Sequence, residues 1–240
     1  MKLPVKRSTL LFLSLLTPGI ALADDSVQAC AEQTLGRFAG IGINYRVDWK
    51  GFSLDSSRTV DKLENGAWKA QNTSTLLFMG IEEESRFRLQ NGSIEPQEYR
   101  YERKGLSKKH NVHLSFDGSG EYEVESPRGD DEIDYQGPVY DLLSHQLQLR
   151  IDLACKPPQD NYAYSIARRK GLSDYNYRYV GEENVQTPAG NFAAVLLEKG
   201  EEGDKLEQIW LAPELNYLVV RFKHQEEDDE AAELLLAKRP

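Results

Sequence analysis

Alternation of apolar and polar residues is the clearest pattern in this chain, and it predicts short β-strands between residues 41 and 222. From 41 to 49 every odd position is apolar or aromatic, while the even positions are Gly, Asn, Arg and Asp. The same alternation returns at Tyr175, Tyr177 and Tyr179. Because successive side chains of a strand point to opposite faces, this period indicates strands with one buried face.

Turn sequences separate these strands at short intervals. Asn65-Gly66 and Asn91-Gly92 are strong hairpin signals, Asp117-Gly118 is a third turn, and Thr187-Pro188-Ala189-Gly190 combines a proline with a glycine that tolerates positive φ. A turn about every 8 to 14 residues favours an antiparallel meander over a βαβ arrangement. We therefore expect a mainly β fold: one long curved antiparallel sheet, an open barrel or spiral, wrapped around one α-helix.

Three segments depart from the strand pattern. Residues 138–153 begin with a proline and follow helical spacing, which predicts a helix from Pro138 to about Arg150, although alternation returns from Leu147. Residues 29–38 are expected to form one or two helical turns. Residues 231–238 have helix-favouring composition, with a closing strand as the competing interpretation.

The first 23 residues have the features of a secretory signal peptide. A basic start is followed by an apolar run at 10–16 and by Ala21-Leu22-Ala23, so we expect cleavage after Ala23. The run is too short to span a bilayer, and no later stretch reaches the roughly 20 apolar residues that a transmembrane helix needs. An alternative is a lipoprotein cleavage box ending at Cys30. The sequence thus predicts a signal peptide, 1–23, and a single exported β-rich domain, 24–240.

The charge of the chain is strongly acidic. With 29 Lys+Arg against 39 Asp+Glu the net charge is −10, and loss of the three basic leader residues lowers it to −13. Such a charge repels phosphate backbones and anionic membrane surfaces, so we do not expect a nucleic-acid partner.

Two cysteines, Cys30 and Cys155, are predicted to form a structural disulfide. Disulfides persist in exported proteins, and this one would close a loop of about 125 residues, for which the chain-entropy model gives a ceiling of roughly 5 kcal/mol. A redox centre and a zinc site fit less well, because there is no CxxC spacing and zinc needs further ligands.

No motif identifies a catalytic or metal site. His110 and His113 would point to opposite faces of a strand, and the neighbours Ser144 and His145 lack a nucleophile elbow. The acidic residues at 130–134 lack the spacing of a calcium-binding loop. We therefore expect no cofactor, no metal and no enzymatic activity.

Aromatic side chains recur on the predicted strands, and two interpretations stay open for them. They form one buried face of the sheet, or a curved sheet uses them to line a cavity for an apolar ligand. The residues assigned to the second interpretation are Tyr45, Trp49, Trp68, Tyr177 and Trp210.

One pentapeptide occurs twice. Arg103-Lys104-Gly105-Leu106-Ser107 recurs as Arg169-Lys170-Gly171-Leu172-Ser173, 66 residues later. The recurrence is compatible with related hairpins and equally with chance, so no prediction rests on it.

A wider set of motifs resembles a known family. Tyr45 with Trp49-Lys50-Gly51, the segments Leu142-x-Ser144 and Leu147-x-Leu149-Arg150, Gly181-Glu182-Glu183 with Thr187-Pro188-Ala189-Gly190, and Trp210-Leu211-Ala212-Pro213 resemble the bacterial domain-of-unknown-function 3108 family. The resemblance implies a Gram-negative periplasmic protein, with a long antiparallel sheet around a helix as in lipoprotein carriers and related spiral sheets. It implies no catalytic residues.

These observations lead to two hypotheses of different classes. The first is a non-enzymatic periplasmic protein of the cell envelope that binds an apolar ligand, an acyl chain or lipid. The second is an envelope scaffold that binds protein partners through exposed sheet edges. A hydrolase is a third interpretation, without a nameable site.

Overall fold

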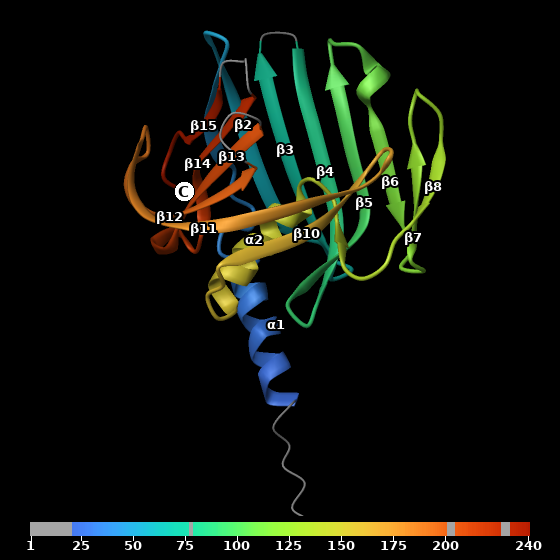
Figure 1. Cartoon of the computed structure of the whole chain (residues 1–240), viewed down its shortest axis with the longest axis horizontal. Helices are drawn as coiled ribbons and strands as arrows, with labels where there is room; N and C mark the ends of the chain where they lie inside the picture. Colours follow the sequence, from blue (N-terminus) through green and yellow to red (C-terminus); the bar gives the residue numbers. More distant parts are fainter. Residues whose placement is uncertain (1–20, 77–78, 201–204, 227–230) are drawn as a thin grey trace, which may run out of the picture.

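The computed structural model describes residues 21–76, 79–200, 205–226 and 231–240. These form two α-helices, two short 3-10 helices (Lys108–His110 and Pro213–Leu215) and one sheet of fifteen strands. The apolar core of the predicted leader lies outside the described residues. The expected fold class, a mainly β chain built on one long curved and almost wholly antiparallel sheet, is confirmed (Figure 1). The sheet wraps around one helix, α2 (Ser144–Cys155), as expected, and a second helix, α1 (Ala21–Gly36), projects from the sheet beside it (Figure 1).

The sheet is built from two meanders that meet at its middle. The first runs through β1 (Ile43–Trp49), β2 (Phe52–Lys62), β3 (Trp68–Leu76), β4 (Met79–Gln90), β5 (Ser93–Lys104), β6 (Val112–Phe116), β7 (Glu121–Glu125) and β8 (Asp131–Asp134). The second runs through β9 (Val139–Tyr140), β10 (Asn161–Arg168), β11 (Gly171–Thr187), β12 (Gly190–Gly200), β13 (Lys205–Ala212), β14 (Leu218–Glu226) and β15 (Ala232–Leu236). β1 pairs with β15, so β8 and β9 are the two edges, and only the β9–β10 pair is parallel.

Two tight hairpin turns follow directly from their sequences. Lys50 and Gly51 have φ of 49° and 74°, and Asn91 and Gly92 have φ of 52° and 74°. Positive φ at both central residues is the type I′ geometry that matches the twist of adjoining strands. At Gly92 a side chain is excluded for a second reason, because Val27 of α1 occupies the position of a Cβ atom.

The helix predicted from Pro138 begins later and ends later than expected. Val139 and Tyr140 form β9, and α2 covers Ser144–Cys155. The start is set by a reciprocal pair of hydrogen bonds: the backbone N–H of Ser144 donates to Asp141 Oδ1 (2.8 Å), and that of Asp141 donates to Ser144 Oγ (2.9 Å). This is the capping-box arrangement, with a serine in the usual Glu or Gln position. The predicted start at Pro138 was wrong because it was inferred from the proline, whereas the start of α2 depends on the hydrogen bonds between Asp141 and Ser144.

The structure also decides the conformation of the other two segments that the sequence left uncertain, residues 29–38 and 231–238. α1 covers Ala21–Gly36, a longer helix than the one or two turns expected at 29–38. The C-terminal segment is the strand β15, so the helical interpretation of residues 231–238 was wrong. Pairing on both sides, with β1 and β14, supplies hydrogen bonds that outweigh the helix propensity of its Ala, Glu and Leu residues.

The sheet curves around α2, which is buried along most of its length (Figure 1). Register shifts in the β4–β5, β11–β12 and β13–β14 pairs provide local bends of the kind that curve a sheet. Within the described residues no helix is long and apolar enough to cross a membrane.

Candidate functional site

The five aromatic residues predicted to bind a ligand do not line one common cavity. Four are buried, each at most 3% exposed: Tyr45, Trp68, Tyr177 and Trp210. Trp49 is 45% exposed at the end of β1, where the Lys50 ammonium lies 5.1 Å from the centre of its ring. The structure therefore places four of these side chains in the core and one on the surface.

The polar atoms of two of these core rings already have partners. Trp210 Nε1 donates to Glu183 Oε2 at 2.9 Å, and the Tyr177 hydroxyl lies 3.2 Å from His145 Nε2. Burial lowers the pKa of His145 to about 3, so the imidazole is neutral at physiological pH. His145 lies on α2 and Tyr177 on β11, so the contact between these two side chains attaches α2 to the sheet.

The neighbouring residues Ser144 and His145 do not form a hydrolytic site. Ser144 is 0% and His145 2% exposed. Ser144 Oγ belongs to the helix cap, and Asp141, whose carboxyl pKa is raised by burial, also accepts a hydrogen bond from Ser85 Oγ at 2.6 Å. A substrate has no access to these groups.

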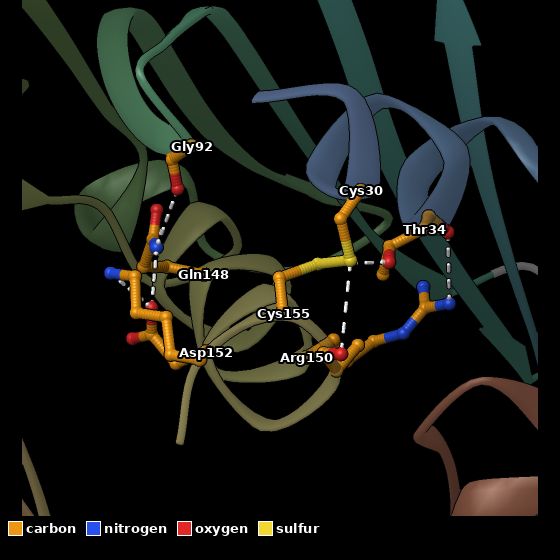
Figure 2. Close-up of a disulfide and its surroundings, with 9 residues drawn as sticks. Cys30, Thr34, Gly92, Gln148, Arg150, Asp152 and Cys155 are labelled. Carbon is orange, nitrogen blue, oxygen red and sulfur yellow. Dashed lines mark hydrogen bonds and ion pairs between the residues drawn. A yellow bond between two sulfur atoms is a disulfide. The ribbon is translucent and has the colours of Figure 1, made fainter. Parts of the chain in front are cut away.

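The predicted disulfide is confirmed. Cys30 on α1 and Cys155 at the end of α2 are joined, with their Cα atoms 5.7 Å apart (Figure 2). Thr34 Oγ1 lies 3.6 Å from Cys155 Sγ, so the bond lies between the packed helices. Because its sulfur is in this bond, Cys30 is not the acylated residue of a lipoprotein.

Both helices are also held by the β4–β5 turn. The Gln148 side chain of α2 accepts the Ile94 N–H at 2.7 Å and donates to the Gly92 carbonyl at 3.2 Å. Gln28 of α1 accepts the Gly92 N–H at 2.9 Å. Figure 2 shows Gln148 reaching Gly92 on one side and Asp152 on the other.

Within the described ranges, no group of three or more His, Cys, Asp or Glu side chains is arranged to hold a metal ion. In the acidic segment, Asp130 accepts the backbone N–H of Ser126, which shapes the loop before β8. His110 and His113 make separate contacts, with Arg128 and Glu125 respectively.

The most distinctive concave feature is a groove where the two meanders approach each other, which we call the seam groove. Tyr122 on β7 donates a hydrogen bond to the Arg168 carbonyl on β10 at 2.8 Å, so the two far parts of the sheet are in direct contact. The groove has a volume of about 570 Å³. It is lined by Tyr99, Tyr101, Arg103, His110, Val112, Leu114, Arg128, Leu142, Ala167, Arg168, Arg169 and Lys170.

Apolar and aromatic side chains form one part of this lining. Tyr99 and Tyr101 on β5 are paired with Leu114 and Val112 on β6, so the four side chains lie on one face of adjacent strands. Leu142, from the segment between β9 and α2, faces the same space. Figure 1 shows the tip of the β10–β11 hairpin in front of β5 and β6, and Arg169 and Lys170 of this tip line the groove.

Besides His110 and Ala167, the lining also includes five basic side chains that are charged at neutral pH: Arg103, Arg128, Arg168, Arg169 and Lys170. No Asp or Glu lines the groove, and no ion pair joins any of the five to a carboxylate in the described part of the chain. Arg103 Nε donates instead to the Tyr101 hydroxyl at 3.2 Å. A local excess of positive charge thus exists on a chain whose net charge is −10.

The lowered pKa of His110 is consistent with this local excess of positive charge. Partial desolvation lowers its pKa, and the charges of Arg128, Arg103 and Lys109 lower it further. His110 is exposed and lies 3.1 Å from Arg128 Nη2, so the neutral ring accepts from the guanidinium.

Sequence reasoning missed this groove, although one signal pointed to it. The repeated pentapeptide contributes Arg103 from its first copy and Arg169 and Lys170 from its second. The first copy ends β5 and the second forms the β10–β11 turn, so the two lie on opposite sides of the seam. The repeat alone could not show that the fold brings its copies together.

Comparisons with known proteins give a family and a fold. Residues 44–236 match the model of a family described as "Protein of unknown function (DUF3108)". No curated protein matches the sequence. Among solved structures, a β-barrel-like protein of the domain of unknown function DUF1849 from Brucella abortus is similar at 10% identity and TM-score 0.53, over 82% of this chain and 94% of that one.

A second solved structure is a lipoprotein candidate from Parabacteroides distasonis. It is 14% identical with TM-score 0.33, over 82% of this chain and 93% of that one. With a TM-score of 0.53 at 10% identity, the Brucella abortus structure bears on the fold alone.

Proposed function

This chain belongs to the DUF3108 family, and we propose that it is a non-enzymatic periplasmic protein of the cell envelope that binds a single-chain anionic amphiphile in the seam groove. The observation that carries the proposal is the combination of an apolar floor with five basic side chains that have no carboxylate partner among the described residues. The disulfide supports an exported location, since such bonds persist in oxidising compartments.

The size and composition of the groove fit such a ligand. Its volume of about 570 Å³ lies within the roughly 300–1,000 Å³ of small-molecule sites. An alkyl chain would cover Val112, Leu114 and Leu142, while a phosphate or carboxylate head would meet the guanidinium groups, which bind such anions through paired N–H donors. In this proposal the acyl chain lies at the seam and not against Tyr45, Trp68, Tyr177 or Trp210.

A larger groove, of about 760 Å³, fits such a ligand less well. Its lining contains both signs of charge, including Arg88, Glu95 and Asp117, and several turn glycines. Because its positive and negative side chains can compensate one another, this groove lacks the excess of positive charge that makes the seam groove suitable for an anion.

The competing hypothesis of a scaffold that binds through sheet edges receives less support. Edge strand β9 has two residues, and edge strand β8 is the acidic tetrapeptide Asp131–Asp134. Short and charged edges are the features by which proteins prevent strand addition.

The proposal is tested by calorimetric titration of the mature protein with dodecyl phosphate below its micellar concentration. We expect saturable 1:1 binding, with inorganic phosphate alone at least tenfold weaker because it lacks the chain. The variant Val112→Glu places a carboxylate on the apolar floor and should weaken binding of dodecyl phosphate at least tenfold. Absence of binding to the wild-type protein would contradict the proposal.

The matched control is Val180→Glu. Val180 lies on β11 with 43% of its surface exposed and does not line the groove. Both variants are first compared with the wild type by circular dichroism. Equal loss of affinity in the two variants would also contradict the assignment to the seam groove.

A further inference from the structure

A separate feature of the core is a small cavity between the helices and the first strands. Its volume is about 50 Å³, far below that of the seam groove. Leu35 and Phe38 line it from the N-terminal segment, Ile43 from β1 and Leu147 from α2. One water needs roughly 10–15 Å³ on this measure, so the cavity has room for a few atoms and none for an alkyl chain.

Two arginines point into this largely apolar space. Arg150 on α2 is only 5% exposed, and burial lowers its pKa to about 10, so it is charged at neutral pH. Arg58 on β2 lies with its guanidinium carbon 5.3 Å from the centre of the Tyr45 ring. Both residues line the cavity.

The hydrogen-bonding capacity of these guanidinium groups is incompletely used. Arg58 Nη1 donates to Gln146 Oε1 at 2.8 Å, and Arg150 Nη2 has two long contacts of 3.5 Å, to the carbonyls of Thr34 and Asn216. The Nε atoms of both arginines are buried without a partner. The Tyr45 ring faces Arg58, but its hydroxyl, which donates to the Val219 carbonyl at 3.0 Å and whose pKa is raised by burial, is neutral and supplies no counter-charge.

No counter-charge for the two arginines is present in this region. No Asp or Glu lines the cavity, and neither arginine forms an ion pair with a carboxylate among the described residues. Charges in a low-dielectric interior are strongly unfavourable unless they are paired and hydrogen-bonded. Two cations around one apolar cavity therefore favour an anion between them.

We propose that this cavity binds one small monoanion, a carboxylate or a halide, between Arg58 and Arg150. The two unpartnered Nε–H groups supply its hydrogen bonds, and the guanidinium charges supply its counter-charge. The cavity volume excludes larger anions. This site is independent of the seam groove, so its failure would leave the proposed function unaffected.

The direct test is a crystal of the mature protein soaked in sodium bromide. An anomalous peak in the cavity, within hydrogen-bonding distance of both arginines, is the expected result. Water alone in the cavity would overturn the proposal.

The solution test compares the melting temperature in sodium formate and in sodium gluconate at equal ionic strength. Formate fits the cavity and gluconate does not, so the wild-type protein should melt higher in formate, by an amount that grows with the logarithm of its concentration. The variant Arg150→Met should lose this difference, while general salt effects act on both proteins. If Arg150→Met does not fold, Arg58→Met replaces it.

The matched control is Arg46→Met, an exposed arginine on β1 paired with Asp48. It should keep the formate effect in full. Equal melting temperatures of the wild type in the two salts, or an unchanged formate effect in Arg150→Met, would overturn the proposal.

Discussion

The hydroxyl of Tyr122 on β7 donates a hydrogen bond to the backbone carbonyl of Arg168 on β10, with 2.8 Å between the two oxygens. These strands are far apart in the order of the sheet, β7 next to one edge and β10 next to the other. The contact therefore joins the two meanders directly and fixes the distance across which the seam groove opens.

Removal of this hydroxyl tests the contact. Tyr122→Phe should lower the free energy of unfolding by about 1 kcal/mol, the usual net value of one hydrogen bond. Urea denaturation measures the loss. Tyr179→Phe, at a tyrosine that is 40% exposed, is the control and should change the value little. Equal stability of the two variants would show that the seam bond does not contribute to stability.

The disulfide between α1 and α2 should contribute more. Replacing both cysteines, Cys30→Ser with Cys155→Ser, is expected to cost roughly 2–5 kcal/mol, because the unfolded chain loses a cross-link over a long loop. Unfolding in guanidinium chloride measures the effect, with the wild type under oxidising and reducing conditions as reference. A double variant as stable as the oxidised wild type would contradict a structural role.

Burial of His145 predicts a pH dependence of stability. Its pKa is lowered to about 3 in the folded state, whereas the unfolded chain takes up a proton below about 6.5. The unfolded state then binds more protons, so stability falls as the pH drops from about 6.5 towards 3, by at most about 1.4 kcal/mol per pH unit.

The variant His145→Gln should show a shallower fall over that range in urea denaturation at several pH values. Asp141, whose carboxyl pKa is raised, acts in the opposite direction but is present in both proteins. His113→Gln, at a histidine paired with Glu125 outside the core, should keep the wild-type slope. Parallel curves for the wild type and His145→Gln would disprove the assignment.

The basic lining of the seam groove should control which head group is bound. The triple variant Arg103→Gln, Arg169→Gln and Lys170→Gln is expected to bind dodecyl phosphate at least tenfold more weakly, a loss of about 1.4 kcal/mol or more. Affinity for the uncharged dodecyl maltoside should be unchanged. The wild-type preference for phosphate should also weaken between low and high salt, because exposed charges are screened.

A charge-matched control changes three exposed basic residues elsewhere on the chain: Arg46→Gln, Arg86→Gln and Lys238→Gln. It alters the net charge by the same amount and should leave both affinities unchanged. If this control loses affinity for dodecyl phosphate as strongly as the groove variant, the net charge and not the groove explains the preference.

Much of the fold follows from local sequence. The alternation at 41–49 and the turns Lys50-Gly51 and Asn91-Gly92 specify strands and hairpins because their side-chain periodicity and positive φ act over a few residues. The helix predicted from Pro138 was misplaced because its start depends on the hydrogen-bonded cap formed by Asp141 and Ser144. In the sequence this polar pair is a weaker helix-start signal than the proline before it. The strand β15 depends on neighbours from both ends of the chain, which local propensity does not contain.

The candidate site was less predictable. Tyr45, Trp68, Tyr177 and Trp210 have the composition of a ligand-binding surface, yet the fold buries all four of them, so they are core residues. Arg103 and Lys170 are far apart in sequence and become neighbours of one groove only when the two meanders meet. Their unusual property, the lack of a carboxylate partner within the described part of an acidic chain, is visible only in three dimensions.

The most direct test of the proposed function is native mass spectrometry of the protein purified from periplasm, followed by organic extraction. We expect the mass of residues 24–240 with the disulfide formed, plus a bound single-chain anionic amphiphile that is recovered from the wild type and lost from Val112→Glu. A wild-type protein that carries only its own mass, and that takes up no amphiphile when one is added, would contradict the proposed function.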